Sequence, residues 1–343
     1  MTVNIALLTS DAVILGCDSI ASTTGYFLDP IALEWDKGPD GKYLQDENKK
    51  FILRFNYDDW LPLVTNAWGG VTKLFLIHPK PTPVAAVTTG LAKLNERPIA
   101  SLAAEFLAMH ERRKKKHLVQ VEVICNEFLK FMREKYLQNY KDTKLPEEMR
   151  EGPEFLVGGF GRDDEFPCVY RINVQRNRVK RQWNTKEATT GVAWGGQSSA
   201  VERFIRGMDG DLKQRIEGET SDALKRYSSD VKAFMAGKIN EILDKVGQPM
   251  PEGISLDLPE PPKINPGWEE FRSDIGYSNM PIQEAINFVS FLVGLQSGQS
   301  RFTRGVATVG GRTHIAVITK DKGFVLLNEP ELQHRNTGFG DDA

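Results

Sequence analysis

The chain has 343 residues, of which 40% are hydrophobic and 26% are charged, the balance of an ordinary globular protein. Its 44 basic and 46 acidic residues leave a formal net charge of -2, so no strong overall field favours a nucleic acid or an anionic membrane as partner. The one dense basic run, at 112–116, lacks interleaved aromatic residues and is interpreted as a solvated helix end.

The cysteines and the hydropathy pattern indicate in which cellular compartment we expect the protein. Cys17, Cys125 and Cys168 stand far apart and form no CxxC pair, which favours reduced thiols over a disulfide framework. The N-terminus lacks a basic stretch followed by an apolar region and a small-residue cleavage site, so we expect no signal peptide. No apolar run approaches the roughly 18 to 20 residues that a membrane span needs. We therefore expect a cytoplasmic protein without a membrane partner.

The chain opens with two strand-like runs. Residues 3–8 and 12–17 are short, continuous and apolar, which is typical of strands buried on both faces. The segment 23–70 differs, because Gly, Asp, Pro and Lys dominate its first half. Within that segment, 51–55 and 61–65 are the candidate strands.

The middle of the chain alternates between strands and helices. Strands are predicted at 73–77 and 83–89. Helices are predicted near 99–107 and 118–137, because apolar residues recur there at three- and four-residue spacing. Further predicted strands lie at 155–160, 168–174, 178–183 and 190–196.

The last third contains an expected insertion at 210–280. A charged helical stretch, 221–246, leads into a Pro-rich segment, 249–268, which resembles a semi-rigid linker or surface loop. Helical periodicity resumes at 282–296. The final predicted strands are 314–319 and 323–327.

The order of these elements predicts a fold class. Strands, two helices, strands, helices and strands follow one another, which suits neither regular βαβ alternation nor an all-β protein. We predict an α+β fold, a four-layer αββα sandwich with two antiparallel sheets between helix layers. We expect a single domain over 2–327, with insertions at 23–70 and 210–280, and a polar, disordered tail over 328–343.

The segment TVNIALLTSDAVILGCDSIAS, residues 2–22, resembles the mature start of proteasome β-type subunits and their bacterial relatives. In that family, whose members are N-terminal nucleophile (Ntn) hydrolases, a terminal Thr opens a strand and the next strand ends in an Asp-Ser motif. Asp18 follows Thr2 at the family's spacing (18 − 2 = 16). KLFLI and PVAAVTTGLA are similar to the strands that carry the catalytic lysine and an oxyanion-hole glycine. The similar segments are 2–22, 72–209 and 282–327.

The resemblance implies the Ntn-hydrolase fold and a threonine-type peptidase in a proteasome-like ring. It implies a peptide or unfolded-protein substrate, a homo-oligomeric ring and, as a further partner, an unfoldase. The implied catalytic residues are Thr2, Asp18, Lys73 and Gly90, and the implied substrate-binding residues are Ser19 and Ser22. The alternatives are a small-molecule amide hydrolase with the same nucleophile and a catalytically inactive structural ring subunit.

The chemistry of a terminal threonine supports these roles. Its α-amine, with a reference pKa of about 7.7, can accept the hydroxyl proton, so the residue is both nucleophile and base. The amine must be free, so we expect removal of Met1, which aminopeptidases achieve when the next side chain is small. Lys73 would stabilise developing negative charge, and Asp18 would hold Lys73 by an ion pair. Lys50, which also precedes an apolar run, is the alternative cation.

Gly90 is interpreted as a residue at a strand-to-helix transition, where the missing Cβ lets substrate approach a helix N-terminal amide. Ser19 and Ser22 would bind extended substrate backbone by strand addition. The sequence departs from the family where Gly195, Val306 and Val309 replace a Ser, an Asp and a Ser that orient the terminal amine. The residues that could orient the amine instead are Gln197, Ser198 and Thr308. In addition, Ile20 replaces the Arg of the family's Asp-Ser-Arg motif.

The sequence predicts no metal and no cofactor. Its five histidines are scattered and none belongs to HExxH or to a Cys/His cluster. No GxxxxGK[ST] loop is present, so an ATP site is not expected. We expect no nucleic-acid partner.

Overall fold

The computed structural model describes residues 2–28, 34–54, 60–113, 119–183, 190–247, 267–303 and 306–327. The chain divides into two compact units, one of Met1–Ser198 with Gly276–Ala343 and one of Ser199–Ile275. The predicted tail, nearly all of the Pro-rich segment and most of the basic run lie outside the described residues. The single domain over 2–327 stays a prediction.

The first sheet of the larger unit is antiparallel at every pairing, in the order β14-β1-β2-β15-β16. Its strands are β1 (Val3–Leu8), β2 (Ala12–Cys17), β14 (Gly191–Gly196), β15 (His314–Thr319) and β16 (Gly323–Leu326). A tight turn joins β1 to β2, and the Thr9 hydroxyl accepts the N–H of Ala12 there at 3.1 Å. β1 and β2 are buried along their whole length, which explains their continuous apolar runs.

The second sheet is also antiparallel, in the order β13-β12-β11-β8-β7. Its strands are β7 (Leu74–His78), β8 (Val84–Thr89), β11 (Glu154–Gly159), β12 (Cys168–Asn173) and β13 (Arg178–Arg181). One buried apolar cluster contains residues of both sheets, among them Leu8, Leu15, Val87 and Leu156. The two sheets therefore bury their apolar faces against each other.

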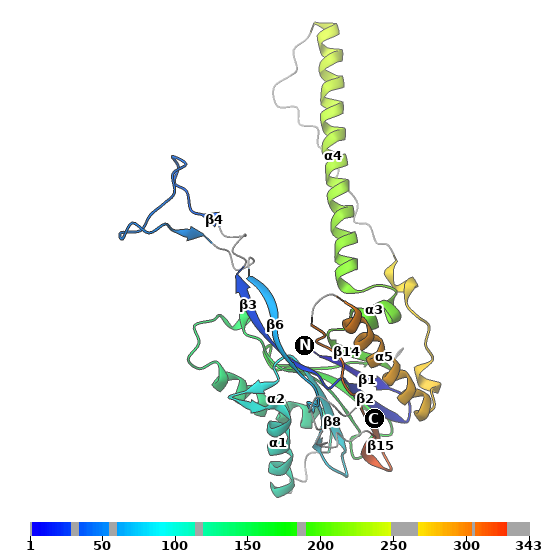
Figure 1. Cartoon of the computed structure of the whole chain (residues 1–343). Helices are drawn as coiled ribbons and strands as arrows, with labels where there is room; N and C mark the ends of the chain where they lie inside the picture. The colour runs from blue at the N-terminus through cyan, green and yellow to red at the C-terminus, as the bar shows by residue number, and fades with distance from the viewer. Residues whose placement is uncertain are drawn as a thin grey trace, which may run out of the picture. The chain divides into compact units, whose positions relative to one another are not determined.

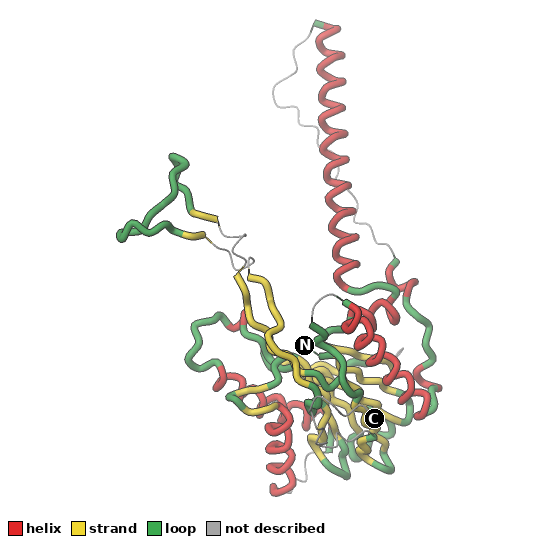
Figure 2. The backbone as a smooth tube through the Cα atoms, viewed as in Figure 1, coloured by secondary structure: helices red, strands yellow, loops and turns green. Residues whose placement is uncertain are grey.

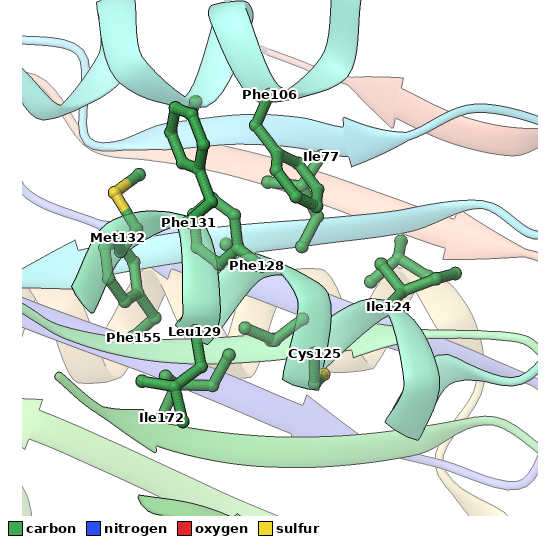
Figure 3. Close-up of a cluster of buried hydrophobic side chains, with 14 of the residues drawn as sticks. Ile77, Phe106, Ile124, Cys125, Phe128, Leu129, Phe131, Met132, Phe155 and Ile172 are labelled. Carbon is green, nitrogen blue, oxygen red and sulfur yellow. The ribbon is translucent and has the colours of Figure 1, made fainter. Parts of the chain in front are cut away.

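Helices pack against both sheets. α1 (Ile99–Arg113) and α2 (Val121–Asn139) share a second apolar cluster with the second sheet, in which Phe128 packs edge-to-face against Phe106 and Phe155 (Figure 3). α5 (Ile282–Phe302) contacts β1, β2 and β15 (Figure 1). The predicted combination of α-helices with antiparallel sheets is confirmed, with five α-helices among the described residues. The finer prediction of a four-layer sandwich stays a prediction.

The segment after β2 contains a two-stranded antiparallel sheet that the sequence only half predicted (Figure 2). β6 (Trp60–Trp68) includes the expected strand at 61–65, whereas its partner β3 (Ala21–Leu28) was not predicted. Further along, β4 (Glu34–Trp35) pairs with β5 (Leu53–Arg54). Here Phe51 contacts Trp35 and Tyr43 edge-to-face.

The smaller unit contains α3 (Ser199–Arg206), α4 (Gly210–Val246) and the 3-10 helix η3 (Trp268–Phe271). α4 begins well before the predicted start at 221, because the Asp209 carboxylate caps it by accepting the N–H of Leu212 at 2.8 Å. Gly247, in the left-handed conformation, ends it. No helix in the described part of the chain is both long and apolar enough to cross a membrane.

Candidate functional site

Two hairpins, one from each sheet, bring three of the predicted residues together. Thr2 precedes β1 and Asp18 follows β2, so the antiparallel pairing of these strands puts both at one end. The N–H of Val3 donates to Asp18 Oδ1 at 3.0 Å. Lys73, which precedes β7, donates from Nζ to the same oxygen at 2.9 Å. Thr2, Asp18 and Lys73 are only 5%, 1% and 4% exposed, so this is a buried polar site between apolar sheets.

The Asp18 carboxylate is fixed by donors on both oxygens. Oδ2 accepts the N–H of Ile20 at 3.0 Å and the N–H of Gly310 at 3.2 Å. Lys73 Nζ also donates to the carbonyl oxygen of Ile20. The carboxylate therefore has no freedom to rotate, and it holds the ammonium group at one position.

The electrostatics of Lys73 follow from burial and pairing. Burial lowers the pKa of Lys73, and the adjacent Asp18 carboxylate opposes that shift. An unpaired ammonium at this depth would favour its neutral form, so the ion pair is what makes a charged lysine tolerable here. Lys50 is different, since it is exposed and its N–H donates to Asp46 Oδ1 in a local turn. The structure thus pairs Asp18 with Lys73 and not with Lys50.

Thr2 is held from the other side by the turn after β14. The N–H of Gln197 donates to the Thr2 carbonyl oxygen at 2.7 Å. Gly196 lies directly under that oxygen with a φ of 74°, and a Cβ on it would stand 1.8 Å from the Thr2 oxygen. Thr308 Oγ1 donates to Gln197 Oε1 at 2.7 Å, so of the three residues expected to replace the missing family groups, Gln197 lies beside Thr2 and Thr308 is bonded to Gln197.

Gly196→Ala is expected to lower stability by several kcal/mol, because it adds backbone strain of about 1–3 kcal/mol to a direct clash with Thr2. Chemical denaturation measures the loss. Gly218→Ala is the matched control, since nothing lies within 4 Å of its added methyl group on α4. That change should stabilise the helix by about 0.5–1 kcal/mol. Equal effects of the two substitutions would contradict the close approach at Gly196.

The structure shows the surroundings of Gly195, Val306 and Val309, the positions where the sequence departs from the family. Gly195 pairs with Asn4, and a Cβ on Gly195 would stand 2.6 Å from Asn4 Oδ1, so a serine does not fit beside this asparagine. Val309 is buried, whereas Val306 is 57% exposed. The N–H groups of Thr308 and Val309 both donate to the Ser300 hydroxyl, which fixes the loop that carries them.

Gly90 lies just beyond β8 with a φ of 81°, and a Cβ on it would stand 2.4 Å from the Gly152 carbonyl oxygen. The backbone therefore requires glycine here, whatever else the residue does. The expected strand-to-helix transition is wrong, because two short strands, β9 (Lys93–Leu94) and β10 (Arg97–Pro98), come between Gly90 and α1. The oxyanion role of Gly90 stays a prediction.

The two predicted substrate-binding serines occupy different settings. The N–H of Ser19 donates to Gly310 O at 3.1 Å, and its hydroxyl accepts the N–H of Arg312 at 2.8 Å. Ser19 thus anchors the loop that also supplies a donor to Asp18. Ser22 lies in β3 opposite Ala67 of β6. Substrate binding by either serine stays a prediction.

Gly310 and His314 are site residues that the sequence interpretation missed. Gly310 donates to Asp18, and the Gly-Gly pair at 310–311 was the available signal. His314 opens β15 opposite Cys17 and is 2% exposed. Burial and, less strongly, the charge of Lys73 lower the pKa of His314, whereas burial and Asp18 raise the pKa of Cys17 to about 12. The groups lining the ion pair are therefore neutral near pH 7.

This shift predicts an acid-side loss of stability. The unfolded state protonates His314 near the ordinary histidine pKa of 6.5, while the folded state resists protonation until a lower pH. The unfolded state therefore binds more protons in that window, and stability falls as pH drops below about 6.5, by at most about 1.4 kcal/mol per pH unit. Denaturation curves at several pH values should show a flatter dependence for His314→Gln than for wild type. Identical slopes would contradict the assignment.

Comparisons with known proteins find similar solved structures. No protein-family model and no curated protein matches it. It is similar to the Anbu complex of Pseudomonas aeruginosa, described as a helical assembly, with 12% identity, 95% of this chain and 84% of that chain covered, and a TM-score of 0.44. It is also similar to a Gly-1 mutant of Anbu from Hyphomicrobium sp. strain MC1, with 11% identity, 96% and 86% covered, and a TM-score of 0.43.

A third similar structure is Anbu from Yersinia bercovieri, described as an ancestral beta-subunit, with 11% identity, 95% and 87% covered, and a TM-score of 0.43. All three are Anbu proteins and none is a proteasome β subunit. The identification as a proteasome β-type subunit, expected from the sequence, is therefore wrong.

Among the described residues, no group of three or more His, Cys, Asp or Glu side chains could hold a metal ion.

Proposed function

We propose that this chain is an N-terminal threonine amide hydrolase, built on a four-layer αββα sandwich, in which Thr2 is nucleophile and base. One observation carries the proposal. The buried Lys73–Asp18 pair is joined by a hydrogen bond to the N–H of Val3, the residue bonded to Thr2. A charged lysine is costly to bury, and a position beside a candidate nucleophile gives it a chemical use.

The proposed reaction begins when cleavage between Met1 and Thr2 frees the α-amine. The amine accepts the Thr2 hydroxyl proton while Oγ1 attacks the amide carbonyl carbon, and the carbonyl oxygen becomes an oxyanion. The Lys73 charge and the N–H of Gly90 stabilise the negative charge that develops. The terminal ammonium then gives its proton to the leaving amine. Water hydrolyses the resulting ester, which releases the acid and restores the hydroxyl.

Peptides are the proposed substrates, and the chain is proposed to act as a homo-oligomer in the cytoplasm. The support for peptides is the polar, strand-flanked setting of Thr2, where an extended backbone can add to a strand. The three cysteines are free and buried, as a reducing compartment allows. An unfoldase partner remains part of the proposal only if folded proteins prove to be substrates.

The purified protein is expected to begin at Thr2. Intact mass and N-terminal sequencing test this directly, since the mass should be lower than that of the full translation product by one methionine residue. The mechanism requires removal of Met1, because an amide nitrogen, unlike a free amine, cannot accept the hydroxyl proton near pH 7. A retained or acetylated Met1 in an active preparation would contradict the mechanism.

A further inference from the structure

The loop between α5 and β15 is bonded to both halves of the candidate site. Its Gly310 N–H donates to Asp18 Oδ2 at 3.2 Å, on the side of the ion pair. Its Thr308 hydroxyl donates to Gln197 Oε1 at 2.7 Å, and the Gln197 N–H donates to the carbonyl oxygen of Thr2 at 2.7 Å. A displacement of this loop would therefore weaken the hydrogen bonds to Asp18 and to Gln197 together.

The loop contains two glycines that make its backbone adaptable. Gly310 and Gly311 have φ angles of 151° and 76°. Because glycine loses more conformational freedom on folding than any other residue, such a pair keeps one conformation only when neighbouring groups fix it. Ser19 fixes the end that follows the glycines, since its hydroxyl accepts the N–H of Arg312 at 2.8 Å.

Ser300, in the last turn of α5, fixes the end that precedes the glycines. Its Oγ accepts the N–H of Thr308 at 3.2 Å and the N–H of Val309 at 3.3 Å, which occupies both lone pairs of the hydroxyl oxygen. Thr308 and Val309 are both buried, and a buried N–H that loses its acceptor is costly. The Ser300 hydroxyl therefore selects the conformation in which the loop reaches the site.

α5 gives this serine a fixed position. The helix lies against the first sheet, where Val289 and Val293 are fully buried (Figure 1). A Cβ on Gly16 of β2 would stand 2.3 Å from Val289 Cγ1, so helix and sheet are in direct contact. A helix packed in this way is a rigid support for a hydrogen-bonding group.

We infer that Ser300 is a positioning residue for the proposed hydrolase, which acts by holding the loop that bonds Asp18 and Gln197. The inference rests on the proposed function, because the position of these groups affects a rate only if Thr2 reacts. A displacement of about 1 Å in an active site can lower a rate by about 100-fold. One hydroxyl at the base of the loop is thus sufficient to affect the reaction through the groups that the loop holds.

The rate at which an epoxyketone labels Thr2 tests the inference. Ser300→Ala removes the acceptor and should slow labelling at saturating inhibitor by about 10- to 100-fold. Ser300→Thr keeps the hydroxyl and should label faster than Ser300→Ala. Ser297→Ala is the matched control and should label at the wild-type rate. Ser297 is a partly buried serine of the same helix, and its hydroxyl donates to the Val293 carbonyl oxygen at 2.8 Å, within the helix.

Hydrogen exchange measured by mass spectrometry reports on the loop itself, under conditions where denaturation curves show every variant to be folded. Residues 308–310 should exchange faster in Ser300→Ala than in wild type and at the wild-type rate in Ser297→Ala. Unchanged exchange or unchanged labelling in Ser300→Ala overturns the inference and leaves the hydrolase proposal intact. A Ser300→Thr variant as slow as Ser300→Ala does the same. Absent labelling in wild type overturns the hydrolase proposal, and the role of Ser300 falls with it.

Discussion

Thr2→Ala is expected to abolish turnover of amide substrates. The substitution removes the attacking oxygen. None of the other site residues described above carries both a hydroxyl and a free α-amine. Loss of a nucleophile from a catalytic unit typically costs about 10⁴- to 10⁶-fold in rate. Thr2→Ser should keep partial activity, because both the hydroxyl and the free amine survive.

A covalent inhibitor gives the sharpest measurement of this prediction. An epoxyketone needs both the hydroxyl and the free amine to close its ring, so intact mass should show one adduct on wild type and none on Thr2→Ala. Thr65→Ala is a suitable control, since Thr65 is an exposed residue of β6 whose hydroxyl donates to the Thr23 carbonyl oxygen. Adduct formation on Thr2→Ala would show that another residue reacts and would contradict the site.

The same experiment separates the alternative functions. Wild type that takes the label and cleaves small amides but no peptide would be a small-molecule amide hydrolase with the proposed nucleophile. Wild type that has a free Thr2, takes no label and cleaves nothing would be a catalytically inactive subunit. The cause of such a loss would be sought at the hydrogen bond between Thr308 and Gln197, because the sequence predicts that these residues replace the missing family groups.

Local patterns in the sequence were sufficient to predict most of the regular helices and strands. The apolar runs of β1 and β2 and the helical stripes of α1, α2 and α5 depend on residues a few positions apart, and each was predicted close to its observed place. β3 was missed because its short polar and aromatic sequence has no continuous apolar run. The early start of α4 depends on one capping contact from Asp209, which a composition of charged residues does not reveal.

The site was predictable only where a resemblance supplied its long-range pairs. Lys73 and Asp18 are 55 positions apart, and Gly310 and Asp18 are 292 apart, so no periodicity connects them. The resemblance named the first pair and missed the second. It also led to the wrong family identification, and the interpretation of Gly90 as a residue at a strand-to-helix transition was wrong as well. The sequence alone could not identify His314 as a site residue, because only the pairing of β15 with β2 places it beside the ion pair.

Lys73→Ala is expected to lower the labelling and turnover rates by about 100- to 1,000-fold, the usual cost of removing one stabiliser of a developing oxyanion. The buried pair also supports the fold, and removing one partner of such a pair costs about 3–5 kcal/mol. Rates must therefore be measured under conditions where denaturation curves show each variant to be folded. Lys50→Ala is the matched control, because Lys50 is an exposed lysine in a local turn.

Asp18→Asn separates positioning from charge stabilisation. The amide keeps the size of the carboxylate but puts an NH₂ group against either the Lys73 ammonium or the N–H donors of Ile20 and Gly310. It should therefore behave like a weakened Lys73, with a slower rate of labelling but the same single adduct on Thr2. A severe effect of Lys50→Ala with a silent Lys73→Ala would show that the cation is misassigned. Normal labelling in Asp18→Asn would show that Lys73 reaches its position without the carboxylate.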